Sequence, residues 1–262
     1  MTLQTESFFL DVSGTVLEVQ RIDSATAQNP SIVFLHEGLG SVSLWRDFPS
    51  RVAAATDCPA IVYSRKGYGN SEVVREARNV RYMHEEALDV LPEFLHKVGI
   101  ERPILLGHSD GASIALIYAG AYGKARALIL LAPHVFVEPL TVAGIAEARE
   151  RAKTSDLIEK LARHHKDSIS AFRGWNDIWL HPEFLNWNIE EYLPRIDCPV
   201  LAIQGSDDEY GTLRQLQAIE RQVHGPFEQV ILNRCSHSPH RDQPDQVLAA
   251  ITRFVAKLEP GA

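Results

Sequence analysis

The chain has 262 residues, of which 45% are hydrophobic and 23% are charged, and this composition excludes a disordered or collagen-like protein. Because 34 acidic residues outnumber 26 basic ones, the formal net charge is −8, which argues against nucleic acid or an anionic membrane as a partner. Three scattered cysteines favour a reducing compartment, and we expect neither a signal peptide nor a membrane span. The sequence therefore predicts a cytoplasmic protein, and a homodimer is compatible with it.

The first predicted element is a β-hairpin. Apolar runs over residues 7–12 and 15–22 meet at Ser13-Gly14, and glycine is typical of a two-residue turn between antiparallel strands. We therefore expect the sheet to begin with an antiparallel pair.

Six further runs are almost continuously apolar instead of alternating, which is typical of strands covered by helices on both faces. They occupy residues 31–35, 60–63, 104–106, 127–131, 200–204 and 227–232. Together with the hairpin they predict an α/β fold with an eight-stranded, mostly parallel sheet.

Helical stretches are predicted between these strands. Amphipathic or buried patterns cover residues 82–98, 112–122, 212–223 and 245–258. Asp242 lies just before Pro244 and is expected to cap the last of these helices.

Residues 134–197 contain no strand-like run, although an unstructured loop of this length would be unusual. Helical patterns at residues 142–153 and 156–165 predict a helical insertion, here called the cap segment. The predicted organisation is thus a core formed by residues 1–133 and 198–262, interrupted by the cap segment.

The clearest chemical motif is Gly107-His108-Ser109-Asp110-Gly111, which has the pattern G-x-S-x-G between a predicted strand and a predicted helix. Glycines two positions before and after the serine permit a sharp turn, since side chains there would collide with neighbouring backbone. The motif predicts that Ser109 is a nucleophile; the alternative is a glycine-rich connection without chemistry.

A serine nucleophile needs a base and an acid that orients the base. The loop after residues 200–204 offers Asp207, Asp208 and Glu209, of which we favour Asp208, with Asp207 bonding the backbone of the turn. The loop after residues 227–232 offers His237, with His240 expected to pack beneath it. All three loops leave the carboxyl end of the sheet, where ligands bind in such folds.

Two backbone N–H groups are expected to bind the oxyanion of a tetrahedral intermediate. Asp110, directly after the nucleophile, supplies one N–H. Gly38, in the loop that follows residues 31–35, is the best candidate for the second; the alternative for this loop is a plain glycine-rich turn.

At these motifs the sequence resembles the α/β-hydrolase family over nearly the whole chain. Residues 36–40 (HEGLG) are similar to the family's H-G-x-x-G oxyanion loop, with Glu37 in place of its first glycine, and residues 64–71 are similar to its D-x-R-G-x-G-x-S loop. The resemblance implies a cofactor-free serine hydrolase whose cap segment covers the nucleophile. The Ser109-Asp110-Gly111 elbow and the end of the cap segment, which leads into residues 193–199, are similar to those of valacyclovir-hydrolase-like esterases and of the carbon–carbon hydrolases of aromatic ring cleavage.

A pocket under such a cap segment would be partly aromatic. Its candidate residues lie in the cap segment or near the oxyanion loop, and they are Glu37, Trp45, His134, Phe136, Trp175 and Trp179. The alternative is that the rings of the cap segment form its own core. A small or medium acyl group fits these residues better than a long lipid.

No metal site is expected. His134, His164, His165 and His181 lack the spacing of a ligand set, and we interpret them, like His84, His96 and His224, as surface residues. The Asp110 side chain could border the pocket and meet a cation, but we favour a role for its N–H alone.

The leading hypothesis is a serine hydrolase that cleaves a small-molecule carboxylic ester through an acyl-enzyme, without a cofactor, metal, nucleic acid or membrane. The same residues serve carbon–carbon bond hydrolysis of a vinylogous diketone, and a perhydrolase side activity. A non-catalytic ligand receptor on the same fold is a third reading, but it predicts a broken triad.

Overall fold

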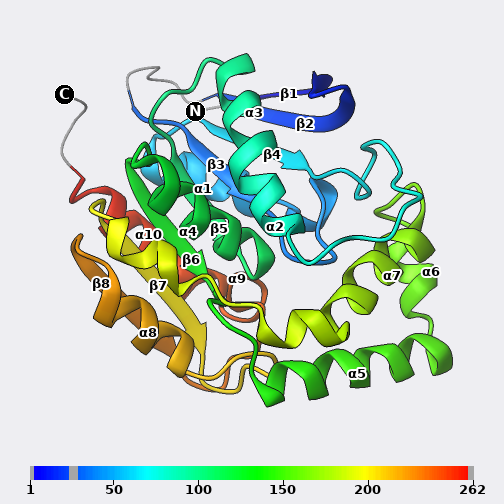
Figure 1. Cartoon of the computed structure of the whole chain (residues 1–262). Coiled ribbons are helices and arrows are strands. Elements are labelled where there is room, and N and C mark those ends of the chain that lie inside the picture. The colour runs from blue at the N-terminus through cyan, green and yellow to red at the C-terminus, as the bar shows by residue number, and fades with distance from the viewer. Residues whose placement is uncertain (1–2, 24–28, 259–262) are drawn as a thin grey trace.

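A computed structural model describes residues 3–23 and 29–258, so the predicted core segments 1–133 and 198–262 lie partly outside the described residues. Eight strands form one sheet in the order β1-β2-β4-β3-β5-β6-β7-β8 (Figure 1). The strands are β1 (Gln4–Val12), β2 (Thr15–Asp23), β3 (Ile32–Leu35), β4 (Ala60–Ser64), β5 (Ile104–His108), β6 (Ala127–Leu131), β7 (Val200–Gly205) and β8 (Phe227–Leu232).

The sheet is antiparallel at one end and parallel from there on. β1 pairs with β2 and β2 with β4 in antiparallel fashion, whereas β3 to β8 pair in parallel. The hairpin turn is where it was predicted, with φ of 52° at Ser13 and 72° at Gly14. The predicted eight-stranded, mostly parallel sheet is therefore confirmed.

Helices cover both faces of this sheet, as the apolar strands require. In the core they are α1 (Phe48–Thr56), α2 (Tyr82–Glu85), the π-turn η2 (Glu86–Val90), α3 (Leu91–Lys97), α4 (Asp110–Tyr122), α8 (Arg214–Gln222), α9 (Pro239–Asp242) and α10 (Pro244–Val255), with a 3₁₀ turn η1 (Ser43–Trp45). α1 and α10 pack on one face, where Phe34 and Leu106 point. α3, α4 and α8 pack on the other, where Leu35 and Leu105 point.

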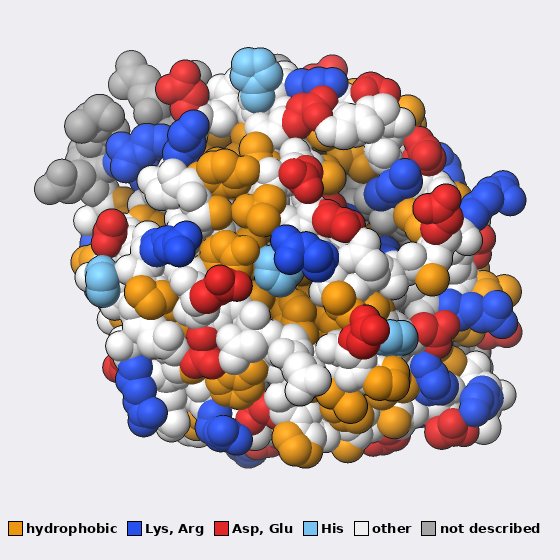
Figure 2. Space-filling view, viewed as in Figure 1, with side chains coloured by type: hydrophobic (Ala, Val, Ile, Leu, Met, Phe, Trp, Pro, Cys, Tyr) orange, Lys and Arg blue, Asp and Glu red, His pale blue; other side chains and the backbone are white. Residues whose placement is uncertain are grey.

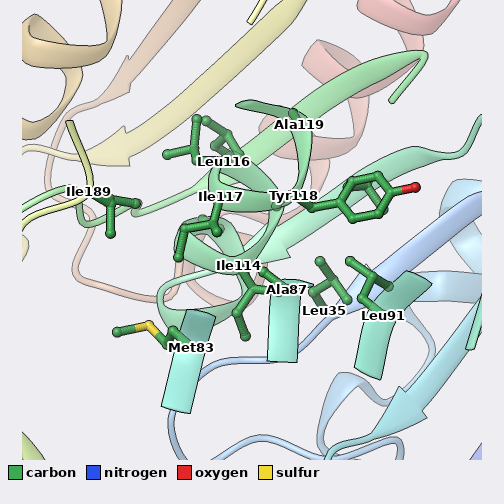
Figure 3. Packing of buried hydrophobic residues seen from close by; sticks show 14 of the residues in the cluster. Leu35, Met83, Ala87, Leu91, Ile114, Leu116, Ile117, Tyr118, Ala119 and Ile189 are labelled. Carbon is green, nitrogen blue, oxygen red and sulfur yellow. The ribbon is translucent and has the colours of Figure 1, made fainter. Parts of the chain in front are cut away.

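Helix α4 is the centre of the second layer. Its residues from Asp110 to Gly120 are all buried, and Ile114, Ile117 and Tyr118 pack among side chains of α2, η2 and α3 (Figure 3). Because α4 begins at the residue after Ser109, this packing fixes the position of the predicted nucleophile.

The cap segment connects β6 to β7 and is helical, as predicted. It contains α5 (Pro139–Thr154), α6 (Leu157–Leu161), α7 (Ser168–Trp179) and the 3₁₀ turns η3 (Pro182–Asn186) and η4 (Glu190–Arg195). In Figure 1, α5, α6 and α7 lie beside the carboxyl ends of the parallel strands. Its division from the core at residues 134 and 197 stays a prediction.

Two local predictions are wrong. Asp242 does not cap α10, whose N-cap is Gln243; it ends α9 and accepts a hydrogen bond from Ser236 N at 2.8 Å. His84 is buried instead of solvated, because η4 places Tyr192 over its ring. Asp242 is bonded within its own loop region, to a residue six positions earlier, whereas His84 is covered by a residue distant in sequence.

The surface in Figure 2 mixes acidic, basic and hydrophobic side chains, without a broad field of one charge. Among residues 3–23 and 29–258, no helix combines the length and the hydropathy that crossing a bilayer requires.

Candidate active site

Ser109 stands on a strained turn between β5 and α4. Its φ of 51° and ψ of −116° lie outside the regions that a non-glycine residue prefers, which costs on the order of 1–3 kcal/mol. A Cβ on Gly111 would lie 1.9 Å from Leu35 O, and one on Gly107 would lie 2.3 Å from Gly111 O. The two glycines are therefore required by close backbone contact, as the motif indicated.

Asp208 and His237 are brought together by the loops after β7 and β8. His237 Nδ1 lies 2.8 Å from Asp208 Oδ1, and the Asp208 side chain is only 1% exposed. The same oxygen accepts hydrogen bonds from Tyr210 N at 2.9 Å and Gly211 N at 3.2 Å. Because Nδ1 is engaged by the carboxylate, Nε2 is the nitrogen of His237 that remains to act as a base.

The other two acids of the loop are placed differently. Asp207 is exposed and accepts a hydrogen bond from Ser206 Oγ at 2.8 Å. Glu209 is also exposed, and its carboxylate meets the backbone N–H of His237, not the ring, at 3.1 Å. Of the three candidates, only Asp208 is placed to orient the imidazole.

Charges in this pair stabilise one another. Burial raises the pKa of Asp208, but the facing His237 outweighs burial and the pKa is lowered to about 2. Burial lowers the pKa of His237, but the Asp208 carboxylate outweighs it, so the pKa lies above the ordinary value for histidine. An imidazolium formed during a proton transfer would thus be stabilised.

His240 and His108 lie behind the predicted base. His240 is buried and packs against Trp45 and Phe48 with ring centroids 4.9 and 5.3 Å away. His108 Nε2 donates to the carbonyl of His237 at 2.8 Å and so holds the backbone of the base. His240 therefore lies beneath the loop, as expected.

The oxyanion loop lies opposite the elbow. A Cβ on Gly38 would lie 2.1 Å from Trp175 Cδ1, so this position has no room for a side chain. Asp110 is the first residue of α4, and its N–H is among those that have no acceptor within the helix. The two expected donors are thus a loop amide and a helix N-terminal amide.

A cavity of about 120 Å³ lies between the core and the cap segment. Predicted residues line it from both sides: Glu37, Gly38, Ser109, His134, Trp175, Trp179 and His237. Residues that the sequence analysis did not single out complete the wall: Leu39, His108, Thr141, Ile145, Tyr210 and Ser238. Thr141 and Ile145 are one turn apart on α5, so the sequence can show that they share a helix face. It cannot show that this face lines the cavity.

Two predicted pocket residues lie elsewhere. Trp45 is 3% exposed and packs edge-on against Phe34, 5.3 Å between ring centroids, in the core beneath η1. Phe136 bridges to Asn188 and lines a separate surface depression beside Arg214. Both predictions rested on nearness in sequence, and neither residue lines the cavity. Trp175 and Trp179 line the cavity and also pack within the cap segment.

Two polar side chains give the cavity its electrostatic character. Burial raises the pKa of Glu37, but contacts with His108 and Arg241 outweigh it and hold the pKa well below its usual value. Burial lowers the pKa of His134 to about 4, with a further contribution from His237. Within the described residues, His134 Nδ1 has no hydrogen-bond partner. Glu37 is thus an anion and His134 a neutral ring.

The surface interpretation of His134 and His165 is wrong, since both are buried. Gly69 N donates to His165 Nδ1 at 2.9 Å, so His165 Nε2 carries the proton and donates to Leu39 O at 3.0 Å. This histidine therefore ties the cap segment to the oxyanion loop. Among residues 3–23 and 29–258, no three His, Cys, Asp or Glu side chains are grouped like metal ligands.

A larger open groove of about 880 Å³ lies on the other side of α7, between Ser170 and Arg75. It contains none of the predicted catalytic residues. We therefore place the candidate reaction in the smaller cavity, which the predicted nucleophile and base both line.

Comparisons with known proteins agree with this architecture. The model of a family described as "Alpha/beta hydrolase family" matches residues 32–250. A proline iminopeptidase of Saccharolobus solfataricus is 23% identical over 283 aligned positions, which cover 88% of this chain and 86% of that protein.

Two solved structures share the fold. A proline iminopeptidase of Mycobacterium smegmatis superposes with a TM-score of 0.73 at 18% identity, over 96% of this chain and 98% of the other. A structure from a study of carboxylesterases of Nitrososphaera gargenis superposes with a TM-score of 0.77 at 19% identity, over 95% and 98%.

Proposed function

Because the chain belongs to the alpha/beta hydrolase family, we propose that it is a serine hydrolase that cleaves a small or medium carboxylic ester through an acyl-enzyme. One observation carries the proposal: the 2.8 Å contact between His237 Nδ1 and Asp208 Oδ1 borders the cavity that Ser109 also lines. Acyl transfer needs a nucleophile, a base and an acid that orients the base, and a cavity lined by Ser109 and by the His237 that Asp208 contacts supports this proposal.

The proposed reaction has two half-reactions. Ser109 Oγ attacks the ester carbonyl while His237 Nε2 takes its proton, and the oxyanion accepts hydrogen bonds from the N–H groups of Gly38 and Asp110. Collapse of this intermediate breaks the ester C–O bond, and His237 gives the proton to the departing alkoxide. Water then attacks the acyl-enzyme by the same steps, which releases the acid and restores Ser109.

The substrate class follows from the walls of the cavity. A volume of about 120 Å³ accommodates a short acyl group, and the apolar walls from Ile145, Trp175 and Trp179 favour an aliphatic or aromatic one. Neither a metal nor an organic cofactor is needed for these steps.

The test is hydrolysis of p-nitrophenyl esters with acyl chains of increasing length by the wild type and Ser109→Ala. We expect turnover of short chains, a steep decline for long chains, and a loss on the order of 10⁶-fold in the variant. Ser155→Ala, at the exposed end of α5, is the matched control and should keep full activity.

A fluorophosphonate probe separates the possible failures. If the probe labelled Ser109 but no ester were hydrolysed, the serine mechanism would stand and the ester would be wrong. The substrate would then contain another scissile bond, such as an amino-terminal amide or a carbon–carbon bond. Absence of both labelling and turnover in the wild type would contradict a serine hydrolase altogether.

A further inference from the structure

The carbonyl of Glu37 accepts three hydrogen bonds. Its donors are Arg65 Nη2 at 2.9 Å, Gly40 N at 3.0 Å and His36 Nδ1 at 2.7 Å. The backbone N–H of Arg65 donates to His36 Nε2 at 3.0 Å, and burial with the charge of Arg65 lowers the pKa of His36, so the single ring proton sits on Nδ1. The peptide that begins at this carbonyl is therefore held by three hydrogen bonds.

That peptide ends in the N–H of Gly38, the proposed donor to the oxyanion. The peptide bond is trans, so its C=O and N–H point in opposite directions. Arg65 and His36 bind the oxygen on one side, and the N–H faces the other side, where Gly38 lines the cavity. Hydrogen bonds to the carbonyl also polarise the peptide and strengthen its N–H as a donor.

The same guanidinium reaches the second donor. Arg65 Nη2 lies 3.5 Å from Asp110 Oδ2, and the two side chains are 3% and 0% exposed. Tyr82 Oη donates to the same carboxylate oxygen at 2.7 Å. Since Asp110 supplies the other proposed N–H, one buried arginine contacts the carbonyl of the peptide that carries the first donor and the side chain of the residue that carries the second.

We propose that Arg65 is a positioning residue that holds the Gly38 and Asp110 N–H groups at a fixed separation around the developing oxyanion. This inference rests on the proposed function. It explains why the carboxylate of Asp110 is turned into the protein, where it meets no substrate. It also gives a reason for the buried Arg65–Asp110 ion pair. Such a pair needs one, because apolar residues of similar volume in its place would often make a protein equally stable.

Burial opposes the charge on Arg65, but the Asp110 carboxylate outweighs burial and raises the pKa of the guanidinium, which therefore stays charged at any working pH. The ion pair consequently acts as a permanent link. Its loss should affect the transition state more than substrate binding, because the oxyanion forms only after attack.

The experiment compares Arg65→Lys with Arg51→Lys, a surface arginine that pairs with Asp245. Lysine keeps the charge but lacks the fork that spans a carbonyl and a carboxylate. We expect kcat for the best short p-nitrophenyl ester to fall about 10–100-fold in Arg65→Lys with KM within twofold, since one lost oxyanion donor costs about 10²–10³-fold. The Arg51→Lys variant should retain wild-type values.

A transition-state analogue separates positioning from general damage. A trifluoromethyl ketone with the same acyl group forms an oxyanion on Ser109, so its Ki should rise in proportion to the loss of kcat/KM. The pH midpoint set by His237 should stay unchanged, because the His237–Asp208 contact is untouched. A folded Arg65→Lys variant with unchanged kcat and Ki would overturn the proposal, as would a shift of the pH midpoint that accounts for the loss.

A second variant guards against misfolding. Arg65→Met combined with Asp110→Asn removes both buried charges together while keeping the two backbone N–H groups, so no lone charge is left buried. It should fold and show the same parallel loss of kcat and analogue affinity. Failure of both variants to fold would make the pair structural and overturn the proposal, whereas absence of ester turnover and probe labelling in the wild type would refute the proposed function first.

Discussion

At Gly38 the structure has no room for a single additional atom. A Cβ there would lie 2.1 Å from Trp175 Cδ1, well inside van der Waals contact. Gly38→Ala should displace the oxyanion loop and lower kcat/KM for short esters by about 10–100-fold, as expected for a misplaced donor.

A double-mutant cycle tests this reason. Trp175→Ala removes the ring with which the new Cβ would collide. Gly38→Ala should therefore lower kcat/KM much less in the Trp175→Ala background than in the wild type. Purely additive effects in the cycle would show that the alanine acts through some other contact.

The acid of the proposed triad can be tested by pH as well as by rate. Asp208→Asn should lower kcat by about 10⁴-fold, because the imidazole loses its orienting partner, whereas the exposed Asp207→Asn should have little effect. His237 must be neutral to act as a base, and Asp208 raises its pKa. The ascending limb of the wild-type pH profile should therefore have its midpoint above 6.5, and Asp208→Asn should move it to lower pH.

At the residue scale, sequence reasoning located the reactive groups because each one follows a strand directly. It missed Arg65 and Tyr82, since their role depends on a carboxylate that is distant in sequence and turned inward. It placed Trp45 in the pocket because this residue follows the oxyanion loop, whereas the 3₁₀ turn η1 buries the ring in the core, which no composition rule predicts.

At the scale of elements, the walls of the cavity depend on how α5 meets α7. Asn176 Nδ2 donates to the carbonyl of Ile145 at 2.9 Å, and Arg149 Nε donates to Asn176 Oδ1 at 2.6 Å. Ile145 and the neighbour of Asn176, Trp175, face the cavity from these two helices. This fully buried amide thus sets the distance between two walls.

Asn176→Ala should lower the free energy of unfolding by about 1–3 kcal/mol, because it removes the hydrogen bonds of a fully buried amide to Ile145 O and from Arg149 Nε. KM for the better esters should rise more than kcat falls, since the walls loosen but the triad does not. Asp177→Ala is the matched control: its side chain is 65% exposed and its ion pair with Arg149 contributes about 0–1 kcal/mol. Equal losses of stability in the two variants would contradict this role of Asn176.

The order of helices and strands was predictable for a physical reason. Strands buried on both faces must be continuously apolar, and the helices between them must be amphipathic or wholly buried, so the pattern along the chain reports the layers. The helix caps were less predictable, because Asp242 accepts a hydrogen bond from Ser236 N instead of capping α10.

At the scale of the whole molecule, buried histidines link folding to pH. Burial lowers the pKa of His134 to about 4 in the folded protein, against 6.5 for an unperturbed histidine. Between these values the unfolded chain binds more protons, so stability rises with pH from about 4 to 6.5 and this contribution is constant above 6.5. His36 and His240, whose pKa values burial also lowers, act in the same direction.

His134→Gln should therefore remove roughly 3 kcal/mol of the difference in unfolding free energy between pH 4 and 6.5. Urea unfolding at several pH values measures it, with the exposed His224→Gln as control. A variant with the same slope as the wild type would show that folding does not lower the pKa of His134.

The three loops that carry the proposed triad emerge from β5 in the middle of the sheet, from β7 and from β8 at its edge. Strand β5 is flanked by neighbours on both sides, whereas β8 has one partner and several exposed side chains. Local unfolding of β8 would move the imidazole of His237 away from Asp208 and Ser109, while the strands in the middle of the sheet stayed folded. The molecule would then lose turnover in a small, reversible opening well before it lost its shape.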